Sequence, residues 1–117
     1  MVRLGIRIGI IDDHPVIITG TVEFLKADKG LEVLSVAPTV KLLLAAGTTL
    51  DVVLLDLHLN DSTTPEENIQ ALARNGISVL AYTSGDRPAL IREAARAGAI
   101  GMIRKSADPS AIIEAVH

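Results

Sequence analysis

Short apolar runs alternate with helix-like segments along the whole chain, and this alternation limits the folds that are available to it. Five runs are rich in Ile and Val and have the length of a strand rather than of a helix. They cover Ile6–Ile11, Leu31–Ala37, Val52–Leu55, Ser78–Tyr82 and Ile100–Ile103. A strand–helix unit that is repeated five times predicts an α/β fold, with a parallel sheet and helices on both of its faces.

Prolines and glycines mark the expected ends of the helices. Each proline follows an apolar run and precedes a helix-like segment, where its missing N–H costs nothing. These prolines are Pro15, Pro38, Pro65, Pro88 and Pro109. Thr64 and Glu67 form a T-x-x-E capping box around one start, and Asp108 precedes another. Four glycines stand where helices are expected to stop, namely Gly30, Gly47, Gly76 and Gly98.

The composition is that of one soluble domain with an aliphatic core. The chain has 117 residues, of which 49% are hydrophobic and only 2% aromatic. A net charge of -3 argues against binding of nucleic acid or an anionic membrane by this segment alone. Cysteine is absent, which excludes disulfides and thiolate sites. Neither a membrane-spanning run nor a signal peptide is recognisable, so a cytoplasmic protein is expected.

Polar side chains follow four of the five expected strands, where ligands bind in an open α/β sheet. They are Asp12 and Asp13 after the first strand, Asp56 after the third, Thr83 and Ser84 after the fourth, and Arg104 and Lys105 after the fifth. The second strand has no comparable group, which places it at an edge and gives the strand order 2-1-3-4-5. The three acids then converge at the switch point between the first and third strands, with Asp56 on the rim of a crevice.

Three converging carboxylates raise one another's proton affinity, and a hard divalent cation relieves their repulsion. Mg²⁺ prefers one or two carboxylates together with water and phosphate oxygens. Lys105 adds a compact positive charge for a phosphoryl group, and Thr83 adds a hydroxyl donor. This set suits phosphoryl transfer, in which a carboxylate can itself be the nucleophile. The alternative is a group of unrelated turn residues, helix caps and a solvated lysine.

At these residues the chain resembles the receiver domain of bacterial two-component response regulators, over essentially its whole length. The motifs are IIDDHP at 10–15, VVLLDL at 52–57, YTSG at 82–85 and GAIGMIRKSADP at 98–109. DDHP with a later KSADP is most similar to regulators that have a LuxR-type helix-turn-helix output domain. The resemblance implies one doubly wound (βα)5 domain of flavodoxin-like topology over residues 1–117, cut from a longer regulator whose output domain is absent.

The resemblance also implies roles for single residues. Asp56 would accept a phosphoryl group from a sensor histidine kinase, and the change would control a transcriptional output. Asp13, Asp56 and the backbone carbonyl of His58 would bind Mg²⁺ directly, and Asp12 would act through water. The phosphoryl oxygens would be held by Thr83 and Lys105.

Other positions are expected to modulate the switch. Met102 stands where the family usually has Tyr or Phe, so coupling from the site to the surface is expected to differ. His58 and Gly85 are expected at the mouth of the site, where side chains steer or block the water that hydrolyses an acyl phosphate. Ser84 belongs to the same modulating group. The loop after Asp56, LHLNDSTTPEEN, lacks the usual Pro and Gly of the family and is about one residue longer.

The first and fifth helices are expected to lie on one face of the sheet and to offer a surface for a homodimer that forms on phosphorylation. In each helix, apolar spacing predicts an inner stripe. The stripes are Ile17, Gly20, Thr21, Phe24 and Leu25 in the first helix, and Ile112, Ala115 and Val116 in the fifth. Ile18, Val22 and Ile113 would then point outward, although single exposed apolar residues are common without any partner.

Two further classes of function are open. One is a Mg²⁺-dependent phosphohydrolase with an aspartyl nucleophile, but haloacid-dehalogenase-like phosphatases have a second Asp where this chain has His58. The other is a binding module that never carries phosphate, against which the complete set of acids, Thr and Lys argues.

DLHLND partly resembles the cobalamin motif D-x-H-x-x-G but lacks its glycine. The histidines, His14, His58 and His117, are expected to be isolated on the surface. We therefore expect a signalling domain and not an enzyme.

Overall fold

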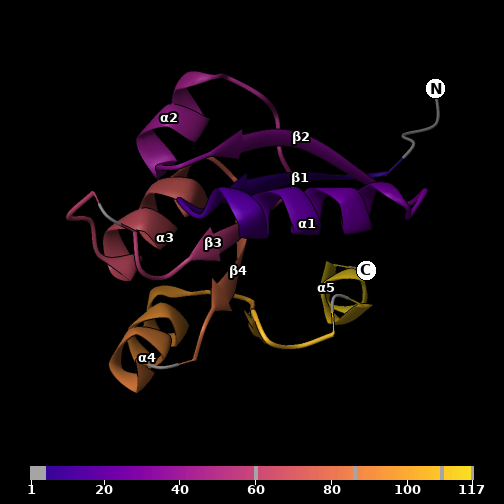
Figure 1. Ribbon diagram of the computed structural model, residues 1–117. Helices are drawn as coiled ribbons and strands as arrows, with labels where there is room; N and C mark the ends of the chain where they lie inside the picture. The colour runs from indigo at the N-terminus through magenta and orange to yellow at the C-terminus, as the bar shows by residue number, and fades with distance from the viewer. Residues whose placement is uncertain (1–4, 60, 86, 109, 117) are drawn as a thin grey trace.

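The computed structural model describes residues 5–59, 61–85, 87–108 and 110–116, and its centre is one parallel sheet with the strand order β2-β1-β3-β4-β5 (Figure 1). The strands are β1 (Ile6–Ile11), β2 (Leu31–Ala37), β3 (Val52–Asp56), β4 (Ser78–Thr83) and β5 (Gly101–Arg104). The helices are α1 (Pro15–Lys26), α2 (Val40–Ala45), α3 (Pro65–Arg74), α4 (Pro88–Ala97) and α5 (Ser110–Val116). The predicted α/β fold and strand order are therefore confirmed.

Helices cover both faces of the sheet, and an aliphatic core fills each side. Helices α1 and α5 share one core, to which Leu25 and Ile112 contribute, while α2, α3 and α4 pack on the opposite face (Figure 1). Strand β3 is buried along its whole length, because it lies in the middle of the sheet and is covered on both sides. Within the described part of the chain, no helix is long and apolar enough to cross a membrane.

The predicted helix ends hold at most positions. The capping box of Thr64 and Glu67 is formed at the start of α3, and Gly98 ends α4 with a φ of 107°. Pro109 lies outside the described residues. The prediction for Gly30 was wrong, because α1 already ends at Lys26. Gly30 instead precedes β2 where two backbones approach each other: a Cβ atom on Gly5 would lie only 2.7 Å from the carbonyl oxygen of Gly30.

The packing of α1 and α5 differs from the predicted stripes. Val22 and Ile113, which were expected to point outward, are partly buried and pack against the core that the two helices share. Gly20 and Ala115, which were expected to face inward, are exposed. Ile18 is partly exposed and belongs to neither core cluster. Of the three residues proposed for an outward surface, only Ile18 therefore lies outside the core.

The strand ends bring the polar residues to one edge of the sheet. Strand β3 ends at Asp56, which pairs in register with Tyr82, and Thr83 closes β4 opposite Arg104 of β5. Strand β5 begins one residue later than the sequence predicts, at Gly101, and Lys105 follows its last residue. Asp12 directly follows β1. Residues that are far apart in the sequence are thus placed side by side by the order of the strands.

Candidate functional site

Two of the acids are buried at the ends of the central strands. Asp12 is 1% exposed and Asp56 is 4% exposed. The expectation that Asp56 lies on the rim of a crevice was therefore wrong. The side chain lines the floor of an open cavity but is itself almost completely covered. Burial of a carboxylate is costly unless it is paired and hydrogen-bonded, so its partners explain how the structure tolerates it.

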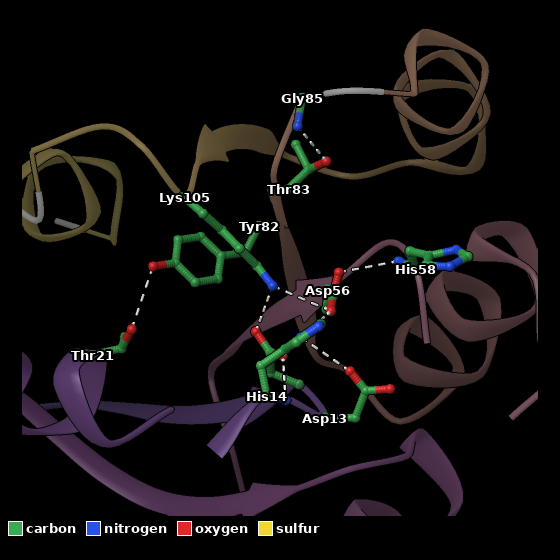
Figure 2. A network of polar contacts seen from close by, with 10 residues as sticks. Asp13, His14, Thr21, Asp56, His58, Tyr82, Thr83, Gly85 and Lys105 are labelled. Carbon is green, nitrogen blue, oxygen red and sulfur yellow. Dashed lines mark hydrogen bonds and ion pairs between the residues drawn. The ribbon is translucent and has the colours of Figure 1, made fainter. Parts of the chain in front are cut away.

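Lys105 is the counter-charge of both buried acids. Its Nζ lies 2.8 Å from Oδ2 of Asp12 and 3.2 Å from Oδ2 of Asp56 (Figure 2). Desolvation alone would lower the pKa of Lys105, but its contacts with Asp12 and Asp56 outweigh this and raise the pKa above its usual value. The backbone N–H of Lys105 donates to the carbonyl oxygen of Thr83 at 2.7 Å, which holds the start of this segment against β4. Lys105 therefore stays charged in the site.

The two acids titrate differently although they share Lys105. Burial raises the pKa of Asp56 above its usual value, and the nearby charge of Asp12 adds to this. Burial would also raise the pKa of Asp12, but hydrogen bonds from Lys105 and His14 outweigh it and leave that pKa lowered. Oδ1 of Asp56 accepts a hydrogen bond from the backbone N–H of His58 at 3.1 Å. Of these two acids, Asp56 is thus the one whose negative charge is less favoured.

His14 is part of this cluster, so the expectation of an isolated surface histidine was wrong for this residue. Its backbone N–H donates to Oδ1 of Asp12 at 2.9 Å, and its Nδ1 lies 2.8 Å from the same oxygen. The hydrogen bond that the ring donates to Asp12 raises the pKa of the imidazole. Sequence spacing gave no sign of this contact, because His14 follows the acidic pair and its ring turns back over it (Figure 2).

Thr83 is buried, but its hydroxyl is directed away from the acids. Oγ1 accepts a hydrogen bond from the backbone N–H of Gly85 at 3.1 Å (Figure 2). Gly85 has a φ of 83°, a left-handed conformation that suits glycine, so the chain turns sharply after β4. Ser84 lies in this turn and is exposed. The predicted contact of Thr83 with a phosphoryl group stays a prediction.

An open cavity of about 240 Å³ lies above the acids. It is lined by His14, Ile17, Asp56, His58, Ser84, Arg87 and Lys105. His58, which was expected at the mouth of the site, lines this cavity, and Ser84 lines it as well, whereas Gly85, which was expected beside His58, is not among the lining residues. The sequence analysis did not predict Arg87 as a residue of the site. The one feature that could have indicated it is its position directly before α4, four residues after Thr83.

Tyr82 connects the site to α1 and was also missed. Its hydroxyl lies 3.3 Å from Oγ1 of Thr21, and both side chains are buried. The Nζ of Lys105 lies 5.6 Å from the centre of the tyrosine ring, within the range of a cation–π contact (Figure 2). Tyr82 is the only tyrosine of the chain. The one sequence feature that could have indicated a role for Tyr82 in the site is its position directly before Thr83.

Met102 lies apart from the acids, on the edge strand β5. It is 43% exposed and lines a separate cavity of about 170 Å³ with Ile91 and several small residues of β4, α4 and β5. The chain thus has a flexible, partly exposed side chain here instead of an aromatic ring. Its predicted part in switching stays a prediction.

The residues present fit a divalent cation. Asp12, Asp13, His14 and Asp56 each offer a ligand atom, and these atoms lie within 4.8 Å of one another. Among the described residues, Oδ2 of Asp56 is buried and accepts no hydrogen bond, although it is ion-paired with Lys105. Mg²⁺ is bound by oxygen ligands, of which one or two carboxylates suffice together with water. The acid edge of the sheet can therefore hold such an ion.

The crowding of the acids predicts that Asp56→Asn stabilises the protein in metal-free buffer. Because the pKa of Asp56 is raised on folding, its ionised form costs stability at neutral pH, and this cost fades as the pH falls below the folded value. The amide removes the charge and leaves Lys105 paired with Asp12. Urea unfolding with EDTA at pH 7.5 should show a higher midpoint.

The control for this experiment is Glu114→Gln, which removes an exposed carboxylate from α5 and should change the free energy of unfolding by no more than about 0.5 kcal/mol. A lower midpoint for Asp56→Asn would show that the ion pair with Lys105 outweighs the repulsion.

Comparison of the sequence with known proteins identifies the family of the chain. The family model of the response regulator receiver domain matches residues 8–117. The nitrate/nitrite response regulator protein NarP of Escherichia coli is 31% identical over 115 residues, which are 95% of this chain and 53% of NarP. The transcriptional regulatory protein UhpA of Salmonella typhimurium is 28% identical over 114 residues, which are 96% of this chain and 57% of UhpA. The chain thus spans little more than half the length of these curated relatives.

A solved structure agrees with this assignment. The crystal structure of a two-component response regulator of the LuxR family from an Aurantimonas species superposes with a TM-score of 0.83 at 28% identity. The match covers 96% of this chain and 82% of that one. The chain therefore belongs to the response regulator receiver domain family.

Proposed function

We propose that this receiver domain accepts a phosphoryl group on Asp56 from a sensor histidine kinase, in a reaction that depends on Mg²⁺. One observation carries the proposal: a buried carboxylate at the end of the central strand is paired with Lys105 and opens onto a cavity of about 240 Å³. Membership of the receiver family supports the same reading. The raised pKa of Asp56 marks a carboxylate whose negative charge is poorly stabilised.

The proposed reaction is an in-line displacement at phosphorus. A carboxylate oxygen of Asp56 attacks, the bond between phosphorus and the kinase imidazole nitrogen breaks, and the nitrogen keeps the electron pair of that bond. The product is an aspartyl phosphate. Asp13, Asp56 and the carbonyl of His58 would hold Mg²⁺, with Asp12 acting through water. The ion would neutralise charge on the phosphoryl oxygens, which is the main requirement of phosphoryl transfer.

Lys105 and Thr83 are the residues of this chain that would hold the product. Lys105 already lies 3.2 Å from Asp56 and needs only a small shift to reach an added oxygen. The hydroxyl of Thr83 accepts a hydrogen bond from Gly85, which leaves its own proton available for a phosphoryl oxygen after a rotation of the side chain. Formation of that contact would loosen the turn at Gly85.

The domain is proposed to act as a switch within a longer regulator and not to turn over an outside metabolite. The relatives that it matches are about twice as long and are described as response regulators or transcriptional regulators. We infer that the longer regulator also contains a helix-turn-helix output domain of the LuxR type. That domain, and not the receiver domain, would bind DNA. A cytoplasmic location follows, because such an output acts on chromosomal DNA.

Phosphorylation should occur on Asp56 alone. Incubation with acetyl phosphate and Mg²⁺ is expected to add one phosphoryl group that hydroxylamine removes, as seen by intact mass spectrometry, because the product is an acyl phosphate. Asp56→Asn should abolish the added mass, while Asp61→Asn, in the loop that follows, should retain it. Full labelling of Asp56→Asn would refute the assignment.

His58 is expected to control how long the phosphoryl group persists. The side chain is exposed and lines the cavity above Asp56, where it can block the path of an attacking water. His58→Ala should shorten the lifetime of the aspartyl phosphate severalfold and change the rate of labelling much less. His58→Gln, which keeps a long polar side chain, should give an intermediate lifetime. Equal lifetimes for all three proteins would count against this role.

Homodimerisation on phosphorylation is proposed to involve Ile18 on α1. The residue is partly exposed and packs in neither core. Sedimentation velocity with beryllofluoride, which mimics the phosphoryl group, should show a dimer for the wild type and a monomer for Ile18→Lys. Leu42→Lys makes the same change at an exposed site on the opposite face and should still dimerise. A wild type that stays monomeric would remove this surface.

A further inference from the structure

The ring of His14 reaches all three carboxylates of the cluster. Its Nδ1 lies 2.8 Å from Oδ1 of Asp12, 3.1 Å from Oδ1 of Asp13 and 3.6 Å from Oδ2 of Asp56 (Figure 2). The backbone N–H of His14 is bonded to Asp12 as well, which fixes the residue in place whatever its ring contacts. One nitrogen atom is therefore held among the acidic ligands of the proposed cation site.

These separations match the spacing of ligands around one metal ion. Donor atoms that each bind an ion at about 2.1 Å lie about 3.0 Å apart at a right angle and about 3.4 Å apart at a tetrahedral angle. The distances from Nδ1 to Asp13 and Asp56, 3.1 Å and 3.6 Å, are of this size. For one ion to bind the nitrogen and both oxygens, Nδ1 must give up its contact with Asp12 together with the proton in it, and the ion must enter beside Lys105.

A second observation concerns the burial of Asp56 and the access to its oxygens. Oδ2 of Asp56 belongs to a side chain that is more than nine-tenths buried, and it lies 3.2 Å from Nζ of Lys105 and 3.6 Å from Nδ1 of His14 without a hydrogen bond of good geometry within the described residues. The half-exposed ring of His14 lines the open cavity, so an ion could enter beside it. The cluster thus has a nitrogen ligand, buried oxygen ligands and an entry path.

We propose that His14 is a metal ligand in this domain and that it makes the site prefer first-row transition cations, such as Co²⁺ or Ni²⁺, over Mg²⁺. Imidazole nitrogen binds these ions well, whereas Mg²⁺ is bound by oxygen ligands and keeps several of its waters. A site of carboxylates alone lacks this source of selectivity. The inference rests on the proposed function only for the location of the cation.

The test is a comparison of metal affinities in tag-free protein at pH 7.5. Co²⁺ is added to the wild type and to His14→Gln, its visible absorption is recorded, and Mg²⁺ is then titrated in competition. The wild type should bind Co²⁺ more tightly than Mg²⁺ and show the absorption of a mixed nitrogen–oxygen site. Because loss of even an outer-shell partner typically costs about 10–100-fold in affinity, His14→Gln should weaken Co²⁺ binding by about tenfold or more and leave Mg²⁺ binding nearly unchanged.

Three results would overturn the inference. The first is a wild type that does not prefer Co²⁺ over Mg²⁺. The second is a rise in affinity for both ions in His14→Gln, because the ring would then be an obstacle that the cation must displace. The third is loss of the preference in His58→Gln instead, because the other imidazole at the cavity would then supply the nitrogen. His14→Asn serves as a second variant, and circular dichroism checks the fold of each protein.

The same samples separate this inference from the proposed function. Labelling with acetyl phosphate and Mg²⁺ is measured on the wild type and on His14→Gln. If both are labelled on Asp56 but their preference for Co²⁺ is the same, the role of His14 is refuted and the phosphoacceptor is not. If the wild type cannot be labelled with Mg²⁺, the proposed function fails independently of the cobalt spectra.

Discussion

The contact of Lys105 with Asp12 and Asp56 is the interaction on which the site depends. It joins the ends of β1 and β3 to the residue that follows β5, so it can form only when the strands take their observed order. Removal of one partner from a buried ion pair leaves an uncompensated charge, which typically costs about 3–5 kcal/mol. One cation here serves two buried anions. The fold therefore tolerates the buried acids without fully neutralising them.

The negative charge of the buried acids is only partly neutralised by Lys105, and this makes the site suitable for binding a cation. Lys105 and His14 hold the pKa of Asp12 low, whereas burial and the charge of Asp12 raise the pKa of Asp56. An added cation would gain from this imbalance, because it would offset the negative charge that remains. The same electrostatics that make Asp56 unfavourable as a buried anion thus favour a metal beside it and a reaction at its oxygen.

The sequence predicted the backbone of this site better than its side chains. Polar residues follow four of the five apolar runs, and the strand order was predicted from this by placing those four strands side by side and the second strand at the edge of the sheet. The burial of Asp56 and the position of His14 could not be predicted in this way, since they depend on rotamers and on neighbours distant in the sequence. The predicted outward faces of α1 and α5 were wrong for a related reason: the face that each helix packs on the core is wider than the predicted stripe, so Val22 and Ile113 pack inward together with stripe residues such as Leu25.

The end of β4 links the site to two different parts of the molecule. Consecutive residues of a strand point to opposite faces, so Tyr82 reaches Thr21 of α1 while Thr83 bonds to the turn before α4. Lys105 lies within cation–π range of Tyr82 and is bonded through its backbone to Thr83. A rearrangement of the Lys105 side chain would therefore change its contact with Tyr82 while the backbone bond to Thr83 keeps its place.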